Sequence, residues 1–259
     1  MAEISPKAVV VDAAGLADDV KVGPFSFVGP EVAVGPGTVI ANHVTVTART
    51  QIGAGCRLFP GCVVGCAPSG PGAGDAACRI GAGNVIREYV TIEAGATLGD
   101  SNLLMVGCHV AHDAVVAGEG IFANFTRIAH HARVEPFVRT SGSTAVEAYA
   151  TVGAYAFTTG YAEVRSDVPP YAIVQGVPVR VRGLNVENLR RCGFDAASID
   201  ALKRAFRLLF NGSRAAPTAE QLTEAEAACE NEYVRHLVQS LRRSAAGTGG
   251  RALAPTTET

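Results

Sequence analysis

Histidine is scarce in this chain, and four of its six histidines fall within one segment of 23 residues. They are His109, His112, His130 and His131, and Asp113 directly follows His112. Imidazole exchanges protons near neutral pH, so His112 beside a carboxylate predicts a general base that takes a proton from a hydroxyl or an amine. Three imidazoles on one site would instead suit a zinc ion. The segment therefore indicates either acid–base catalysis or a metal site.

A repeat of six residues must position this segment. A branched aliphatic residue recurs at every sixth position from Val10 to Val64, and the pattern resumes at Ile80 and runs to Val164. Only Phe122, Thr140 and Thr158 depart from it. The residue two positions earlier is usually small or β-branched, and glycine often follows the aliphatic residue. Neither the helical period of 3.6 nor simple alternation produces this pattern. It predicts a parallel β-helix, with glycine at corners where a side chain would clash or where φ must be positive.

Hexapeptide repeats of this kind resemble the left-handed β-helix acyltransferases, in which three hexads close one coil of 18 residues. The resemblance implies about eight coils for the 25 hexads of this chain. His109 precedes the inward-facing Val110 and so points outward, while His112 lies near a corner. His130 has the same phase one coil later, with His131 beside it. At least three imidazoles are therefore expected on one region of the outer surface.

The composition excludes several other classes of protein. The net charge of −2 is too low for a nucleic-acid binder with a broad basic face, and 48% apolar residues with only 18% charged residues exclude a disordered chain. We find no apolar run long enough to span a membrane and no secretory signal at the N-terminus. Four of the seven cysteines occupy the small inward position of the repeat, which predicts reduced, structural thiols and a cytoplasmic protein.

The pattern divides the chain into three parts. Residues 1–183 are expected to form the mainly β, left-handed parallel β-helix, interrupted by a loop rich in glycine and proline at 65–79. This loop either lines a site or is a tolerated insertion. Residues 184–245 carry apolar residues at helical spacing and predict an α-helical C-terminal domain. Residues 246–259 are expected to be a disordered tail.

Longer motifs resemble the UDP-N-acetylglucosamine O-acyltransferases that open lipid A biosynthesis. The most specific is the His-x-x-His-Asp segment at 109–113, and the resemblance extends over almost the whole chain. The other matching segments are 86–88, 90–92, 101–105, 167–171, 183–187, 189–191 and 193–194.

The resemblance implies an enzyme that transfers a 3-hydroxyacyl chain from acyl carrier protein to the 3-hydroxyl of UDP-N-acetylglucosamine. It implies a homotrimer with active sites in clefts between neighbouring prisms, and a reaction that needs no cofactor and no metal. His112 would be the general base, oriented by Asp113, and backbone N–H groups would stabilise the oxyanion. Basic side chains of the helical domain either attract the acidic carrier protein or form a solvated face. These side chains are Arg190, Arg191, Lys203, Arg204 and Arg207.

The same resemblance implies a set of substrate-binding residues. His109 and His131 would contact the sugar nucleotide, and His130 occupies the place of the oxyanion-hole glycine. Gly160 lies where the family measures acyl-chain length, and a glycine there leaves room for a longer chain. The nucleotide part of the substrate would be held by Asn185, Glu187 and Arg191.

Some positions depart from the family pattern. Glu93 replaces a substrate-contacting histidine, and the loop at 65–79 lacks the family's Gln-Asp-Leu-Lys-Tyr segment. These departures leave two alternatives open, namely a related acyltransferase with a different nucleotide-sugar acceptor and a non-catalytic paralogue. A zinc protein of the hexapeptide carbonic-anhydrase type is less favoured, because the His112–Asp113 pair and the helical domain are typical of acyl transfer.

Overall fold

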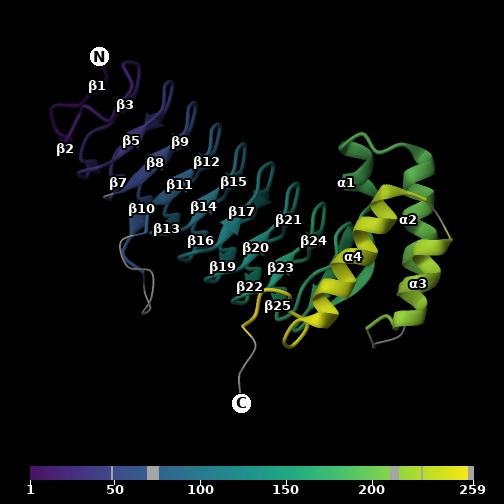
Figure 1. The fold of residues 1–259 in the computed structure, drawn as a ribbon. Helices are drawn as coiled ribbons and strands as arrows, with labels where there is room; N and C mark the ends of the chain where they lie inside the picture. Colours follow the sequence, from purple (N-terminus) through teal and green to yellow (C-terminus); the bar gives the residue numbers. More distant parts are fainter. Residues whose placement is uncertain (48, 69–75, 211–215, 229, 256–259) are drawn as a thin grey trace.

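The computed structural model describes residues 1–47, 49–68, 76–210, 216–228 and 230–255. Short strands follow one another around a long prism, and helices gather at its C-terminal end (Figure 1). Most strands pair in parallel with the strands 18 residues away; for example, Leu104 pairs with Ile86 on one side and Phe122 on the other. The exceptions are the pairs across the inserted loop and the last two strands of the first sheet. Three hexads therefore close one coil. This confirms the predicted fold class, a parallel β-helix of hexapeptide repeats followed by helices.

The strands stack into three sheets, one on each side of the prism. The first sheet contains β1 (Glu3–Ile4), β3 (Lys21–Val22), β6 (Val39–Ile40), β9 (Arg57–Leu58), β12 (Val85–Ile86), β15 (Leu103–Leu104), β18 (Ile121–Phe122), β21 (Arg139–Thr140), β24 (Phe157–Thr158), β26 (Ala172–Gly176) and the antiparallel β27 (Val179–Leu184). The second contains β2 (Val9–Val10), β4 (Phe27–Val28), β7 (Thr45–Val46), β10 (Val63–Cys66), β13 (Thr91–Glu93), β16 (His109–Val110), β19 (Arg127–Ile128), β22 (Ala145–Val146) and β25 (Glu163–Val164). The third contains β5 (Ala33–Val34), β8 (Thr50–Ile52), β11 (Cys78–Ile80), β14 (Thr97–Leu98), β17 (Val115–Val116), β20 (Arg133–Val134) and β23 (Thr151–Val152).

The core of the prism consists of the hexad residues that the sequence pattern singles out. The aliphatic residue that ends most strands is buried, and so are most of the small residues two positions before it. A short hexad leaves room for only one large and one small inward side chain, which explains how the chain builds a long core without tryptophan.

Glycine serves mainly to let successive coils approach each other. A Cβ on Gly53 would lie 2.6 Å from the backbone of Gly81, and a Cβ on Gly153 would lie 2.4 Å from that of Pro170. The corner positions with positive φ are mostly occupied by other residues, including Asp113 and His131, both with a φ of 56°. Steric exclusion, rather than positive φ, therefore accounts for the glycines that follow the aliphatic residues at 53 and 153.

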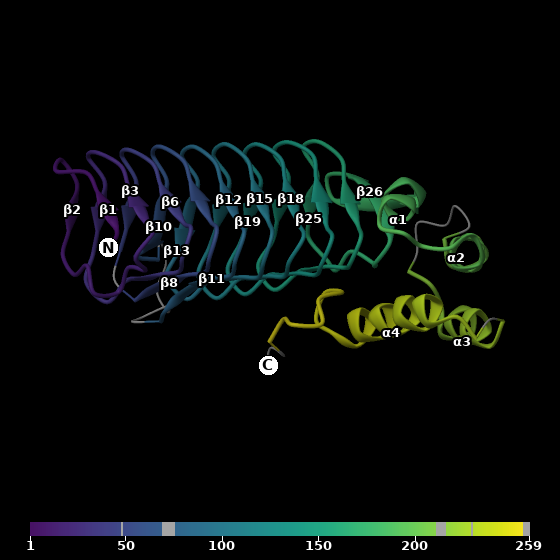
Figure 2. The same ribbon diagram turned by 90° about the horizontal axis from the view of Figure 1, so that it is seen from above.

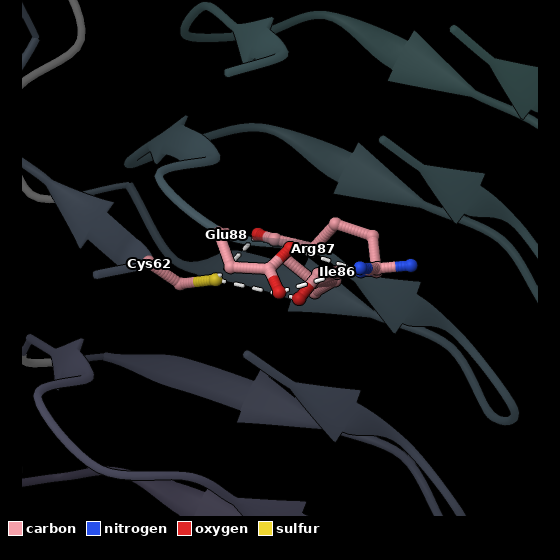
Figure 3. Close-up of polar contacts among 4 residues, drawn as sticks. All are labelled: Cys62, Ile86, Arg87 and Glu88. Carbon is pink, nitrogen blue, oxygen red and sulfur yellow. Dashed lines mark hydrogen bonds and ion pairs between the residues drawn. The ribbon is translucent and has the colours of Figure 1, made fainter. Parts of the chain in front are cut away.

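The described cysteines are free and belong to the scaffold. Figure 3 shows Cys62, whose thiol lies 2.9 Å from the carbonyl oxygen of Arg87 and 3.4 Å from that of Ile86. Burial raises the pKa of the Cys62 thiol to about 12, so the group is an unreactive thiol at neutral pH. In the same corner, Arg87 pairs with Glu88 at 3.0 Å. Cys229 lies outside the described residues.

In the part of the chain that the structure describes, four helices follow the last strand: α1 (Val186–Arg191), α2 (Ala196–Leu209), α3 (Ala219–Ala227) and α4 (Glu232–Ala246). Asn185, Asp195, Thr218 and Asn231 cap their N-termini with side-chain oxygens. Figure 2 shows α4 beside the last coils, where the Tyr171 hydroxyl and His236 Nδ1 lie 2.7 Å apart. Within the described residues, no helix is both long enough and apolar enough to cross a bilayer.

The C-terminal segment differs from the predicted disordered tail. Residue 246 is the end of α4, and the chain then turns back onto the β-helix. The Asp167 N–H donates to the Gly250 carbonyl at 2.8 Å, and the Asp167 carboxylate accepts from the Ala252 N–H at 2.9 Å. Arg251 Nη1 donates to the Ala148 carbonyl at 3.0 Å. Residues 247–255 are thus held by hydrogen bonds that composition cannot reveal, while 256–259 lie outside the described residues.

The predicted loop at 65–79 is flanked by structure on both sides. β10 continues to Cys66 and β11 begins at Cys78, so the excursion from the coil is shorter than the sequence suggests. Its central residues, 69–75, lie outside the described residues.

Candidate active site

The histidine segment forms one cluster at the corner between the second and third sheets. The His131 N–H donates to the His112 carbonyl and the Tyr149 N–H to the His130 carbonyl, both at 3.3 Å, so successive coils stack these residues. The rings of His112 and His130 are stacked with centroids 5.1 Å apart, and His131 meets both rings edge-on. Tyr149 stacks on His131 at 4.9 Å. We call His112, Asp113, His130, His131 and Tyr149 the corner cluster.

His112 and Asp113 form a pair suited to proton transfer. His112 Nδ1 and Asp113 Oδ2 lie 2.9 Å apart, and His112 is only 7% exposed. An ionised carboxylate accepts hydrogen bonds but cannot donate them, so the neutral imidazole carries its proton on Nδ1. The lone pair of Nε2 is then the group that can accept a proton from a substrate.

Glu93 holds the backbone of His112. It lies at the end of β13, opposite an irregularity in β10 where the register shifts between Val64 and Cys66. The Glu93 side chain is buried, and its Oε2 accepts a hydrogen bond from the His112 N–H at 2.9 Å. The departure from the family pattern at position 93 thus places a carboxylate against the backbone of His112.

His109 lies on the other side of Glu93. Its Nε2 is 3.9 Å from Glu93 Oε1, and its Nδ1 is 2.8 Å from the Thr91 hydroxyl. Burial lowers the pKa of His109 from the ordinary imidazole value, and the Glu93 carboxylate opposes that shift. His109 faces outward from β16, as predicted. Glu93 contacts both His109 and the backbone of His112, and so links His109 to the corner cluster.

His130 is half-buried and stacks on His112. Its Nδ1 is buried and has no hydrogen-bond partner among the described residues. Burial lowers the pKa of His130, and positive charge on His112 and His131 would lower it further. The lowered pKa favours the neutral ring of His130, which adds no positive charge next to His112.

The remaining predicted residues lie elsewhere on this chain. Asn185 caps α1, and its amide donates to the Tyr155 carbonyl at 2.9 Å. Glu187 and Arg191 form an exposed ion pair on α1 at 3.0 Å. Gly160 follows β24, and a Cβ there would have no atom nearer than 3.6 Å, so the backbone is open on that side. Within the described residues, no hydrogen bond, ion pair or ring contact joins these four residues to the corner cluster.

Among the cavities formed by the described residues, two lie near the C-terminal end of the prism. The larger, of about 670 Å³, is lined by β26, β27 and the helices, and the smaller, of about 570 Å³, lies between α4 and the third sheet. Neither is lined by a residue of the corner cluster. Within the corner cluster, His112 is buried and the other members are half-buried.

Sequence reasoning missed two contributors to this site. Tyr149 lies 18 residues after His131, so the repeat period alone could have placed it in the same column. The bond from Glu93 to the His112 backbone had no comparable signal, because it depends on an irregular strand register and on the direction of one side chain.

Glu93→Ala is expected to lower the free energy of unfolding by about 1–3 kcal/mol, because it leaves the buried His112 N–H without its acceptor. Glu93→Gln keeps an acceptor oxygen on a side chain of the same length, so its free energy of unfolding should fall less than that of Glu93→Ala. Equilibrium unfolding in denaturant measures both variants. Equal stability of the wild type and Glu93→Ala would show that this bond does not anchor the base.

Comparison with known proteins adds independent information. Residues 167–249 match the family model described as UDP N-acetylglucosamine O-acyltransferase, Domain 2. An acyl-[acyl-carrier-protein]–UDP-N-acetylglucosamine O-acyltransferase from Synechocystis sp. is 40% identical over 220 residues, which cover 82% of this chain and 79% of the relative. The enzyme of the same name from Rhizobium johnstonii is 38% identical over 239 residues, covering 88% of each chain. The crystal structure of a UDP-N-acetylglucosamine acyltransferase from Bacteroides fragilis superposes with a TM-score of 0.88 at 30% identity, covering 92% of this chain and 96% of that one.

Proposed function

This chain belongs to the family of acyl-[acyl-carrier-protein]–UDP-N-acetylglucosamine O-acyltransferases, and from that premise we propose that His112 is the general base of its reaction. The enzyme moves a 3-hydroxyacyl chain from acyl carrier protein to the 3-hydroxyl of UDP-N-acetylglucosamine, the first step of lipid A biosynthesis. The observation that carries the proposal is the 2.9 Å pairing of His112 Nδ1 with Asp113 Oδ2.

The proposed mechanism follows from the tautomer of His112. Nε2 takes the proton of the sugar 3-hydroxyl as its oxygen attacks the thioester carbonyl carbon. The Asp113 carboxylate stabilises the imidazolium that forms. The tetrahedral intermediate then collapses, the carbon–sulfur bond breaks, and the imidazolium returns the proton to the leaving thiolate. The products are the O-acylated sugar nucleotide and the free thiol of the carrier protein.

The oxyanion of that intermediate needs a hydrogen-bond donor. The backbone N–H of His130 has no acceptor among the described residues, while its neighbours Ala129 and His131 both donate to the next or preceding coil. We assign the His130 N–H to the oxyanion, as the position of the family's oxyanion-hole glycine suggests. The imidazole of His130 stacks on His112, with ring centroids 5.1 Å apart, so this N–H belongs to the residue next to the proposed base.

The substrate-binding residues require more than one copy of the chain. We propose that His109, His130 and His131 contact the sugar nucleotide at the corner cluster. We further propose that a homotrimer brings Asn185, Glu187 and Arg191 of the helical domain, together with Gly160, to the clefts between neighbouring prisms. The absence of any contact between these residues and the corner cluster within one described chain supports this arrangement.

The remaining parts of the proposal concern the surroundings of the reaction. Acyl carrier protein is the donor, and its acidic surface would meet the basic side chains of α1 and α2. The chemistry uses protein groups alone and needs no cofactor or metal. Free, buried thiols of high pKa, such as Cys62, fit a reducing cytoplasm.

A different nucleotide-sugar acceptor is the second candidate. It is favoured by Glu93, whose carboxylate lies beside His109 where the family has a substrate-contacting histidine. A transfer assay with hydroxyacyl carrier proteins of several chain lengths distinguishes the two candidates when UDP-N-acetylglucosamine is compared with other UDP-sugars. Transfer to UDP-N-acetylglucosamine at the highest kcat/KM supports the first candidate, and a clear preference for another UDP-sugar supports the second.

Asp113→Asn is expected to reduce kcat by about 10- to 100-fold, because the neutral amide no longer stabilises the imidazolium through a charged hydrogen bond. The KM for the sugar nucleotide should change less than kcat. Steady-state kinetics separates the two parameters. A variant with full kcat would show that Asp113 does not support the base.

A further inference from the structure

Three side chains of the corner cluster combine the donor types that bind transition metals. One ligand atom each from His112, Asp113 and His131 lies within 4.8 Å of the other two. The rings of His112 and His131 meet at 85° with centroids 5.5 Å apart, so their nitrogen lone pairs can be directed at a common point. In contrast, His112 and His130 are nearly parallel, at 4°, and cannot both direct lone pairs at one ion as they stand.

The scaffold fixes the backbone of all three residues. Asp113 and His131 occupy the same corner position one coil apart, each with a φ of 56°. The His131 N–H donates to the His112 carbonyl at 3.3 Å, and Glu93 accepts from the His112 N–H at 2.9 Å. Zinc–nitrogen bonds are about 2.1 Å long, so side-chain rotation alone must bring the three ligand atoms closer together. A site with its backbone already in place loses little conformational freedom when an ion binds.

The charge around these residues favours a cation. Asp113 supplies one carboxylate to the ion itself, and Glu93 places a second, buried carboxylate against the backbone of His112. Asp113 is about one-third exposed and His131 is partly exposed, which leaves a path for an ion from solvent. Two imidazoles and one carboxylate suit zinc, with water at the remaining positions.

We propose that His112, Asp113 and His131 bind one divalent transition-metal ion such as Zn²⁺, and that the bound ion inhibits acyl transfer. Asp113 lies against Nδ1 of His112, so an ion shared by the two residues takes the place of the Nδ1 proton. The proton of the neutral imidazole then sits on Nε2, and no lone pair is left to accept a proton from the substrate. Metal binding stands on the geometry alone, whereas the inhibition rests on the proposed function. The ion is an inhibitor of this enzyme and has no part in its reaction.

The test uses metal-free, full-length protein and two probes. Calorimetric titration with Zn²⁺ gives the affinity and stoichiometry, and titration with Co²⁺ gives a visible absorption band that reports the ligand geometry. We expect one ion per chain in the wild type. His131→Asn and Asp113→Asn should each weaken binding by at least about 10-fold. His43→Asn is the matched control, because His43 lies on another corner of the prism, stacked on Phe25. This variant should bind Zn²⁺ as tightly as the wild type does.

Thermal melting of each variant shows that it is folded, and His131 and Asp113 are tested separately so that one unstable variant does not decide the result. A wild type that binds no Zn²⁺, or variants of His131 and Asp113 that bind as tightly as His43→Asn, would overturn the proposal. The activity arm is separate: Zn²⁺ should abolish acyl transfer and a chelator should restore it. Binding without inhibition would overturn the inhibitory role. Metal binding by a protein with no transferase activity would support the site and contradict only the proposed function.

Discussion

His112→Ala is expected to reduce kcat/KM for acyl transfer by about 10²–10⁴-fold, the usual contribution of a positioned general base. No other group in the corner cluster combines a fixed tautomer with a lone pair directed away from its partner. His131 is not paired with a carboxylate in the described residues, and the Nδ1 of His130 is buried. Steady-state kinetics with acyl carrier protein and UDP-N-acetylglucosamine measures the loss.

The melting transition of His112→Ala should remain close to that of the wild type, because the core of the prism consists of the hexad aliphatics and not of this corner. His43→Ala provides the control, since it removes an imidazole from another corner of the same prism. If His112→Ala retained most of its activity, or if His43→Ala lost as much, the assignment of the base would be wrong.

Leu104→Ala is expected to destabilise the protein by about 2–5 kcal/mol. Leu104 is 1% exposed and stacks between Ile86 and Phe122 of the neighbouring coils, so truncation leaves a cavity that the strand pairing on both sides cannot close. Equilibrium unfolding in denaturant measures the change. The effect should be large because each coil contacts only its two neighbours and contributes through those interfaces.

Leu103→Ala is the matched control for that measurement. Leu103 precedes Leu104 in β15 and points outward, so its side chain is only partly buried. Leu103→Ala should therefore lower the free energy of unfolding much less than Leu104→Ala does. Similar losses for the two variants would contradict the inward and outward alternation on which the interpretation of the hexads depends.

The fold could be predicted because the repeat period is a whole number. Six residues return the chain to the same phase, so a single register assigns Leu104, Val110 and Ile128 to the core and His109 to the surface. The family resemblance is confirmed by relatives of up to 40% identity, and it could be recognised because the His-x-x-His-Asp segment has kept its spacing. These inferences need only the order of residues along the chain.

What the sequence could not supply depends on contacts between distant segments. Composition predicts a disordered tail, yet Gly250 and Ala252 form hydrogen bonds with Asp167, more than 80 residues away. Composition also cannot show that Asn185 caps a helix and bonds to the Tyr155 carbonyl. The relation of α1 to the corner cluster requires neighbouring copies of the chain, so the sites proposed on α1 stay predictions.

The central claim is that His112 acts as a base, and the pH dependence of kcat/KM tests it most directly. We expect the wild-type rate to fall as the pH decreases, because a protonated imidazole cannot accept the hydroxyl proton. In His112→Gln the small residual rate should lack this decrease, because the glutamine side chain does not ionise. A His112→Gln variant that retained both a high rate and the same acid limb would show that another group removes the proton, and would contradict the account.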